Sequence, residues 1–248
     1  MSKVKILLLR RWYMVGGAAL LAAAAIFYAV NYPASVSAAA TTRQLPIYSV
    51  ERSQKVCAIS FDAAWGNEDT QMLIDILGKY NVKATFFVVG ARAEAHPELV
   101  RRMVAEGHVV GNHSYTHSWR FPLRSLGRTM EELRRTGEVL HRITGRQPRL
   151  FRPPFGVTNP TIARAVRRLG LDPVGWSIRS LDTMGQSPER VAARILRRLH
   201  PGAVILLHDR CAGSERLVGL LVEGLRSRGL EPVTLPELFN IEAYEKTR

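Results

Sequence analysis

The chain has 248 residues, of which 46% are apolar and 23% charged, a balance typical of a globular protein large enough to bury a core. Its formal net charge of +14 favours polyanionic partners such as an acidic cell-wall polymer, anionic lipid or nucleic acid. The basic residues are spread along the chain without a nucleic-acid-binding motif, so we expect no nucleic-acid partner.

The first 31 residues predict a membrane anchor or a signal segment. Residues 3–11 are basic, and residues 12–30 are apolar and uncharged, which is close to the ~20 residues that a helix needs to cross a bilayer. The basic flank orients such a helix with its N-terminus in the cytoplasm. Small residues around Ala38–Ala40 suit a signal peptidase. We therefore expect the rest of the chain to be extracytoplasmic, tethered by residues 12–30 or secreted after cleavage near residues 38–40.

Residues 32–54 are small and polar and predict a linker, and residues 55–248 predict a single domain. In this domain strand-like runs alternate with helical ones, and Pro97, Pro160 and Pro188 begin three of the helices. Strands are predicted at residues 56–61, 83–89, 108–110, 149–151, 174–178, 203–207 and 232–235. No glycine-rich phosphate loop follows the first strand, so we predict a distorted (β/α) barrel of about seven parallel strands, not a doubly wound open sheet.

Two cysteines, Cys57 and Cys211, allow at most one disulfide. Cys57 begins a predicted strand, whereas Cys211 lies in the loop after another. Opposite ends of parallel strands are too far apart to bridge, so we expect both thiols to be unpaired.

Ionisable side chains follow several of the predicted strands, namely Asp62, His113, His117, Arg152, Asp182 and His208. Any one of them alone carries little weight, because strand ends border polar loops. In a parallel barrel, however, the C-terminal ends of the strands meet at one mouth, where functional residues collect. The convergence of the whole set therefore favours a catalytic site.

The chemistry that this set supports is metal-assisted hydrolysis. His113 and His117, four residues apart, suit a divalent metal such as zinc. Asp62 is placed to accept a proton from water, and His208 is placed to protonate a leaving amine. Asp182 would orient His208, and Arg152 would keep Asp62 ionised.

Five ordered motifs resemble those of the NodB-type polysaccharide deacetylases, carbohydrate esterase family four, over about residues 56–238. They are Ser60-Phe61-Asp62-Ala63, His113-Ser114-Tyr115-Thr116-His117, Arg152-Pro153-Pro154-Phe155, Asp182-Thr183 and Leu206-Leu207-His208. The resemblance implies a glycan substrate of N-acetylglucosamine type, with Asp62 as base, His208 as acid and the backbone N–H of Phe155 in an oxyanion hole. Residues 61–66 resemble the sporulation-associated branch, which acts on peptidoglycan. We expect a monomer.

The sequence departs from the family pattern at Ala63, where the family has a metal-ligand aspartate. His113 and His117 are then the matched ligands, whereas catalytic zinc normally has three. We expect weak metal binding unless Asp62, Glu68 or Asp69 completes the site.

Thr183 also departs, because it replaces a tryptophan that lines the family's substrate groove. A deacetylase with an altered metal site and a non-catalytic glycan-binding relative both stay open, as does, less favoured, a basic wall-binding protein without a pocket. The retained acid and base groups, Asp62, Asp182 and His208, favour the enzyme.

Overall fold

A computed structural model describes residues 21, 45–64, 68–209 and 213–246. Apart from Leu21, the predicted membrane segment and cleavage site lie outside the described residues, as does Cys211, whereas Cys57 is a free buried thiol. No helix within the described residues is long and apolar enough to span a membrane. The chain divides into two compact units, Met1–Arg43 and Gln44–Arg248, and the fold below is that of the second.

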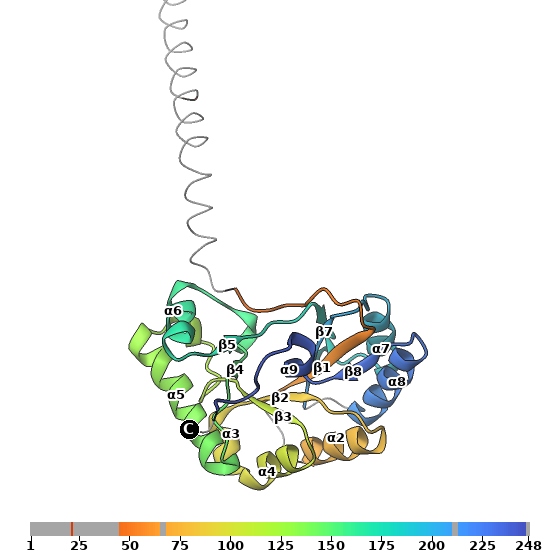
Figure 1. Ribbon diagram of the computed structural model, residues 1–248, viewed down its shortest axis with the longest axis horizontal. Helices are drawn as coiled ribbons and strands as arrows, with labels where there is room; N and C mark the ends of the chain where they lie inside the picture. The colour runs from red at the N-terminus through yellow and green to blue at the C-terminus, as the bar shows by residue number, and fades with distance from the viewer. Residues whose placement is uncertain (1–20, 22–44, 65–67, 210–212, 247–248) are drawn as a thin grey trace, which may run out of the picture. The chain divides into compact units, whose positions relative to one another are not determined.

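The second unit is built on one curled sheet of parallel strands (Figure 1). The strands are β1 (Val56–Ala63), β2 (Thr85–Val88), β3 (Val109–Asn112), β4 (Leu150–Phe151), β5 (Asp172–Pro173), β6 (Ile178–Arg179), β7 (Val204–His208) and β8 (Glu231–Val233). They lie in the order β5-β4-β3-β2-β1-β7-β6, with β8 paired to the start of β1. Among the described residues no ladder joins β5 to β6, so the expected barrel is a half-barrel.

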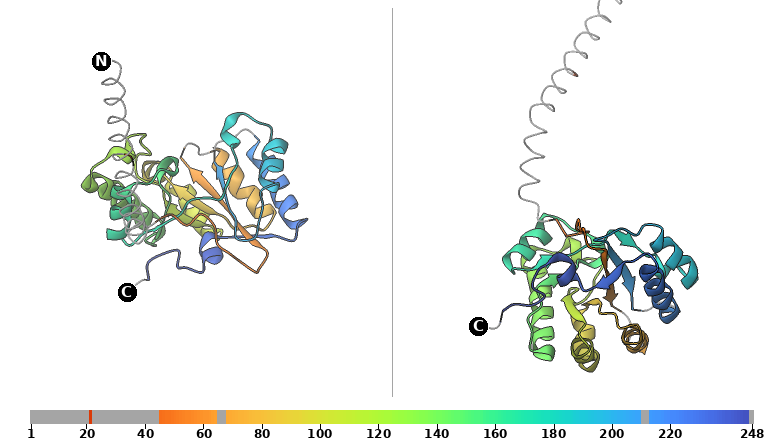
Figure 2. Two further views of the ribbon diagram at one scale, coloured as in Figure 1. Left: turned by 90° about the horizontal axis from the view of Figure 1, so that it is seen from above. Right: turned by 45° about the vertical axis from the view of Figure 1, so that its right-hand side comes forward.

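Helices follow most strands, and all except the last pack on the convex side of the sheet (Figure 2). They are α2 (Glu68–Lys79), α3 (Gly90–Ala95), α4 (Pro97–Ala105), α5 (Leu126–Thr144), α6 (Pro160–Arg168), α7 (Pro188–Leu196), α8 (Ser214–Arg226) and α9 (Leu235–Phe239). The helix starts predicted at Pro97, Pro160 and Pro188 are confirmed, since each proline is the first helical residue. Short 3₁₀ turns η1 (Phe121–Leu123), η2 (Pro154–Gly156) and η3 (Asp182–Met184) lie in the loops.

The side chains of β1 alternate between two sides of the sheet, and this alternation places the site. The odd-numbered residues 57–63 belong to the main hydrophobic core, which the convex-side helices cover. Ala58 belongs to a second cluster on the concave side, where it packs with Leu235 of α9. Ser60 and Asp62 follow Ala58 on the same side, because side chains two residues apart share a face of a strand. The concave side thus changes from apolar to polar along β1.

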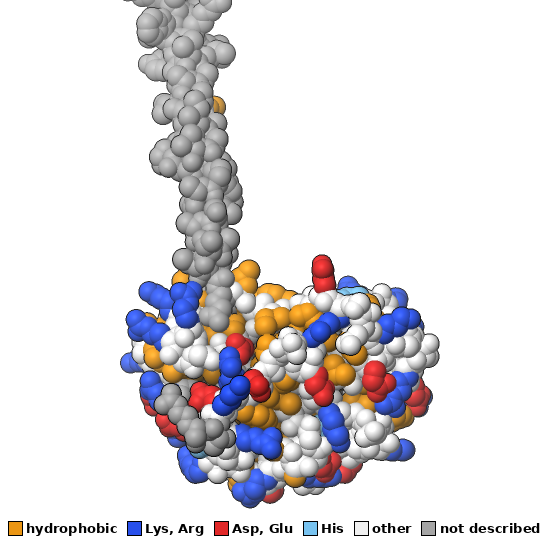
Figure 3. All heavy atoms as spheres, viewed as in Figure 1, with side chains coloured by type: hydrophobic (Ala, Val, Ile, Leu, Met, Phe, Trp, Pro, Cys, Tyr) orange, Lys and Arg blue, Asp and Glu red, His pale blue; other side chains and the backbone are white. Residues whose placement is uncertain are grey.

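α9 closes the concave side at the end of the sheet opposite the polar residues. The backbone N–H of Leu235, its first residue, donates to the hydroxyl of Thr85 at 3.1 Å, and Thr85 begins β2. The C-terminal strand ends therefore form the open mouth. On the face seen in Figure 3, Lys and Arg side chains are scattered among Asp and Glu.

The strand predicted at residues 174–178 is wrong over most of its length, because β5 ends at Pro173 and β6 begins at Ile178. Residues between them cross from one edge of the sheet to the other. Their backbone groups are satisfied without a ladder: Gly175 donates to the carbonyl of Ile47, and Ser177 donates to that of Val204. Glycine at 175 lets the ring of Tyr48 approach the backbone, since a Cβ there would lie 2.4 Å from the ring.

The last part of the predicted linker, residues 45–54, lies against the domain. Ile47 forms a bridge with Val174, and Ser49 forms one with Ala203. The Nε of Arg52 donates to the carbonyl of Leu238 at 2.9 Å.

Candidate active site

Arg152 is a fully buried charge at the centre of the concave side. Its Nη1 donates to Oδ1 of Asp62 at 2.9 Å, and its Nη2 donates to Oγ of Ser60 at 2.9 Å and to the carbonyl of Gly175 at 3.0 Å. Its guanidinium also lies 4.2 Å from the ring centroid of Phe87. Desolvating a charge costs several kcal/mol, and such partners are what offset the cost. Arg152 therefore fixes the position of the Asp62 carboxylate.

His113 follows β3 and presents one ring nitrogen to Asp62. Its Nδ1 lies 2.8 Å from the carbonyl oxygen of Arg152, so we assign the ring proton to Nδ1 and the lone pair to Nε2. Nε2 is buried, has no hydrogen-bond partner among the described residues, and lies 3.5 Å from Oδ2 of Asp62. An accepting nitrogen aimed at a carboxylate oxygen is the arrangement that a shared cation would satisfy.

His117 lies on the same side of the site, with its ring centroid 4.9 Å from that of His113. Burial lowers the pKa of both imidazoles, for His117 to about 4. Both rings are thus neutral near pH 7, the state in which imidazole binds a metal. Among the described residues no group of three His, Cys, Asp or Glu side chains has the geometry of a metal site.

The turn that joins the two histidines is held by Glu132, a residue that the sequence analysis did not identify. Its Oε2 accepts hydrogen bonds from the backbone N–H groups of Tyr115 at 3.0 Å and Thr116 at 2.9 Å, and its Oε1 pairs with Arg124 at 2.9 Å. Glu132 is buried on α5. Its one signal in the sequence is that it is an acid directly before Leu133, which lies on the apolar face of α5.

Backbone strain gathers at the same loops. Four residues other than glycine or asparagine have positive φ among the described residues: Ser114 (+63°), His117 (+49°), Phe155 (+60°) and Leu181 (+61°). All four lie in the loops that follow β3, β4 and β6 at the mouth of the sheet. Such conformations cost ~1–3 kcal/mol each and persist where the surrounding structure enforces them, most often at functional sites.

His208 ends β7 directly beside Asp62, because the two residues are partners in the β1–β7 ladder. Its Nδ1 lies 2.8 Å from Oδ1 of Asp182, and its backbone N–H donates to Oδ2 at 2.8 Å. The hydroxyl of Ser180 donates to Oδ1 as well. Burial opposes the charged form of His208, but the hydrogen bond to Asp182 outweighs it and raises the pKa of His208 above its ordinary value.

The carboxylate of Asp62 is shifted in the opposite direction. Burial would raise its pKa, but the charge and the hydrogen bond of the Arg152 guanidinium hold the pKa of Asp62 below its ordinary value. A charged carboxylate and a readily protonated imidazole therefore stand on neighbouring strands, the separation of roles that acid–base catalysis needs.

Phe155 lies in η2, with its ring centroid 4.7 Å from that of His117. Its backbone N–H donates to no acceptor among the described residues, and its side chain is 55% exposed. The strained turn at Phe155 thus presents a backbone donor beside the histidines.

The predicted site residues lie at the C-terminal strand ends. Glu68 and Asp69 are the exceptions, because their side chains lie outside the described part of the chain. Ala63 is turned away from the histidines. It belongs to the main core and lines a small cavity with Thr70 and Asp209, on the convex side of the sheet. Asp62 and Ala63 therefore face opposite sides, as adjacent strand residues do.

The sequence profile described as polysaccharide deacetylase matches residues 49–174. The chain belongs to the polysaccharide deacetylase family. Because the match spans β1 to β5, it contains Asp62, both histidines and Arg152, while Asp182 and His208 lie beyond it.

Several relatives of this chain are peptidoglycan deacetylases by name. The peptidoglycan-N-acetylglucosamine deacetylase of Bacillus cereus is 32% identical over 76% of this chain and 70% of its own length. The peptidoglycan-N-acetylmuramic acid deacetylase PdaA of Bacillus subtilis is 31% identical over 73% of this chain and 70% of its own length. YlxY of Bacillus subtilis is 31% identical, and the chain spans 60% of its length.

Solved structures share the fold. The Bc1960 peptidoglycan N-acetylglucosamine deacetylase superposes with a TM-score of 0.77 and 30% identity, covering 80% of this chain and 94% of its own. BA3943 of Bacillus anthracis, described as a CE4 family pseudoenzyme, superposes with a TM-score of 0.75 and 26% identity, covering 79% of this chain and 69% of its own.

Deacetylases of this family are generally metal-dependent. The residues present here fit a divalent ion, because the lone pair of His113 Nε2 is buried without a hydrogen-bond partner among the described residues and a carboxylate oxygen faces it. His113 and His117 would hold the ion. The methyl group of Ala63 supplies no ligand.

Proposed function

We propose that the protein is a metal-assisted deacetylase that hydrolyses the N-acetyl amide of N-acetylglucosamine-type residues in peptidoglycan and releases acetate. The observation that carries this proposal is the ladder pairing of Asp62 with His208 beside two neutral histidines. Amide hydrolysis needs a base and an acid. The ionised carboxylate of Asp62 is the base, and the readily protonated imidazole of His208, on the adjacent strand, is the acid.

The roles follow from the contacts of each side chain. A divalent ion, zinc by its donor type, would polarise the acetamido carbonyl and acidify water when bound. Asp62 accepts the proton of the attacking water, since Arg152 keeps the carboxylate charged and oriented. His208 gives a proton from Nε2 to the departing amine, because Asp182 occupies its Nδ1. The N–H of Phe155 donates to the carbonyl oxygen as negative charge develops there.

A second function, glycan binding without catalysis, is favoured by two observations. Ala63 supplies no ligand, and a matching structure is described as a pseudoenzyme. We favour the enzyme because a glycan-binding protein has no need of an imidazole, His208, that Asp182 holds ready for protonation.

We also propose that the domain works outside the cytoplasm as a monomer, tethered through residues 12–30 or secreted. The basic residues that precede this apolar run and the net charge of +14 support attraction of the domain to an acidic wall.

Acetate release from N-acetylglucosamine oligomers tests the proposal. Protein purified without added metal is assayed before and after zinc titration, with its metal content measured by mass spectrometry. We expect zinc-dependent acetate release that falls about 10²-fold or more in His208→Ala. The exposed Arg198→Gln variant is the control. Oligomer binding without acetate release at any zinc concentration would identify a glycan-binding protein instead.

A further inference from the structure

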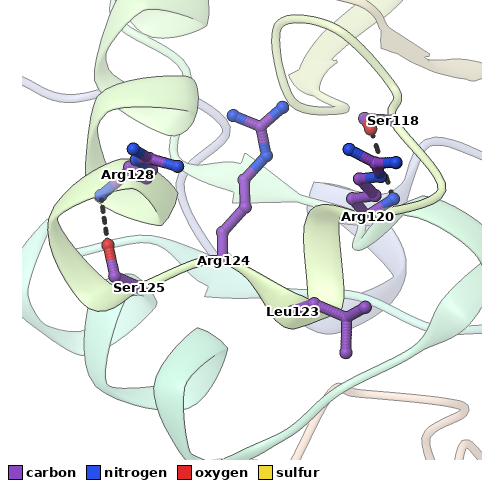
Figure 4. Close-up of a pocket in the computed structure, with 6 residues that line it drawn as sticks. All are labelled: Ser118, Arg120, Leu123, Arg124, Ser125 and Arg128. Atoms are coloured by element: carbon purple, nitrogen blue, oxygen red, sulfur yellow. Dashed lines mark hydrogen bonds between the residues drawn. The ribbon is translucent and has the colours of Figure 1, made fainter.

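An arginine-lined groove of about 660 Å³ lies beside the loop that carries the two histidines. Its lining residues are Ser118, Arg120, Leu123, Arg124, Ser125 and Arg128. Figure 4 shows the side chain of Arg124 extending between those of Arg120 and Arg128. Three guanidinium groups within one groove are the basis of the inference.

The three arginines differ in how far their charge is balanced. Arg124 pairs with the buried Glu132 at 2.9 Å and donates to the hydroxyl of Thr116 at 3.3 Å. The guanidinium of Arg120 lies over the ring of Trp119, and the backbone N–H of Arg128 donates to the hydroxyl of Ser125. Within the described residues neither Arg120 nor Arg128 has an acidic partner. The groove therefore carries two guanidinium groups, those of Arg120 and Arg128, that form no ion pair within the described residues.

The start of α5 adds to the positive potential of the groove. α5 spans 19 residues, Ser125 is its N-cap, and no acidic residue lies in its first turn. The N-terminus of a long helix carries partial positive charge, which attracts anions. The arginines of the groove and the N-terminus of α5 thus both favour an anionic ligand.

The groove adjoins the candidate active site through the chain itself. Ser118 follows His117 directly, and Arg120 comes three residues after it, a stretch that spans at most ~10 Å. Glu132 ties the two regions together, because its carboxylate holds both Thr116 of the histidine turn and Arg124 of the groove. A glycan seated at the histidines would therefore pass the groove with a neighbouring part of its chain.

We infer that this groove binds a carboxylate of the glycan and directs the enzyme to strands that bear N-acetylmuramic acid with a free lactyl group. The inference rests on the proposed function. Guanidinium forms paired, charge-assisted hydrogen bonds with carboxylate, whereas a neutral N-acetylglucosamine polymer offers the groove no such partner. Overall sequence identity does not select between N-acetylglucosamine and N-acetylmuramic acid as the substrate. The relative named as an N-acetylglucosamine deacetylase is 32% identical to this chain, and the one named as an N-acetylmuramic acid deacetylase is 31% identical.

Three substrates compared with the full-length protein test the inference. They are peptidoglycan strands freed of peptides, the same strands after amidation of their carboxylates, and N-acetylglucosamine oligomers. Both kcat/KM for acetate release and Kd by calorimetry are measured. The test variant is Arg120→Gln with Arg128→Gln, and the control is Arg198→Gln. Arg124 stays unchanged, because its loss would leave the buried Glu132 carboxylate without its ion pair.

We expect the wild type to favour the free carboxylate over the amidated strand by about tenfold, and the double variant to lose most of this preference. Salt of about 0.5 M should weaken the preference, since it screens exposed charges. Equal values for the two strands in the wild type, or an unchanged preference in the double variant, would overturn the inference.

Phosphate inhibition and strand binding without catalysis give two further outcomes. Inhibition by inorganic phosphate that vanishes in the double variant, without any carboxylate preference, would assign the groove to phosphate and overturn the carboxylate. If no strand releases acetate, a carboxylate preference in Kd that the double variant loses supports the groove, although the proposed catalysis then fails.

Discussion

The carboxylate of Glu132 accepts a hydrogen bond from the backbone N–H of Thr116 at 2.9 Å, and this contact ties α5 to the turn between the two histidines. The turn contains two residues with positive φ, Ser114 and His117. Strained backbone of this kind relaxes unless its surroundings hold it. Glu132 is therefore a positioning residue for the pair of imidazoles.

Replacing Glu132 should weaken metal binding without touching a ligand. We expect Glu132→Ala to lower zinc affinity about 10–100-fold, the effect typical of residues that orient metal ligands. Calorimetric zinc titration measures it. Glu131→Gln is the matched control, since Glu131 is the adjacent acid and pairs with Arg134 on the surface. Equal zinc affinity in Glu132→Ala and wild type would remove the positioning role.

Breaking the buried pair at the centre of the site should destabilise the fold. Arg152→Met leaves the Asp62 carboxylate buried without its ion pair, so we expect a loss of about 3–5 kcal/mol in the free energy of unfolding. Arg152→Met combined with Asp62→Asn should recover part of it, because no unpaired charge remains. Urea unfolding followed by circular dichroism measures each value, with exposed Arg198→Met as control. A loss below about 1 kcal/mol would contradict the structural role of the pair.

The Asp182–His208 pair should make both the stability of the fold and the release of acetate depend on pH. Because the folded-state pKa of His208 is raised above its ordinary value of about 6.5, the pair with Asp182 stabilises the fold fully below about pH 6.5. This stability is lost as the pH rises through the folded-state pKa, and acetate release should fall over the same range. NMR titration of the His208 ring gives the midpoint, which Asp182→Asn should lower. An unmoved midpoint would show that Asp182 does not tune His208.

Placing an aspartate at position 63 tests whether the metal site lacks a third ligand. Ala63 is the last residue of β1, so the longer side chain in Ala63→Asp would reach the metal by leaning past the end of the strand toward the mouth. We expect tighter zinc binding and faster acetate release than in wild type, because a third, charged ligand is added. Ala63→Asn, which has the same shape without the charge, is the control.

The small cavity beside Ala63 offers the new carboxylate a second position, away from the metal. If the new carboxylate enters this cavity next to Asp209, like charges are buried together. Zinc affinity would then stay unchanged while the free energy of unfolding falls, and the expectation for Ala63→Asp would be wrong.

Local features of the sequence predicted most of the elements and the set of candidate residues. Helix starts at Pro97, Pro160 and Pro188 were predictable because a proline at the first helical position acts within one turn of chain. Asp62, His113 and His208 were predictable as a set because each follows an apolar run, and the C-terminal ends of parallel strands share one edge. The family resemblance of five motifs rests on the same residues.

Only the tertiary structure decided which side chains meet. The sequence places Glu132 sixteen residues after Thr116, and nothing local connects them; packing of α5 against the β3 loop does. The same holds for the incomplete closure between β5 and β6, where crossing residues bond to the distant Ile47. Periodicity and capping act over one or two turns of chain, whereas these contacts depend on how whole elements pack, which no short pattern encodes.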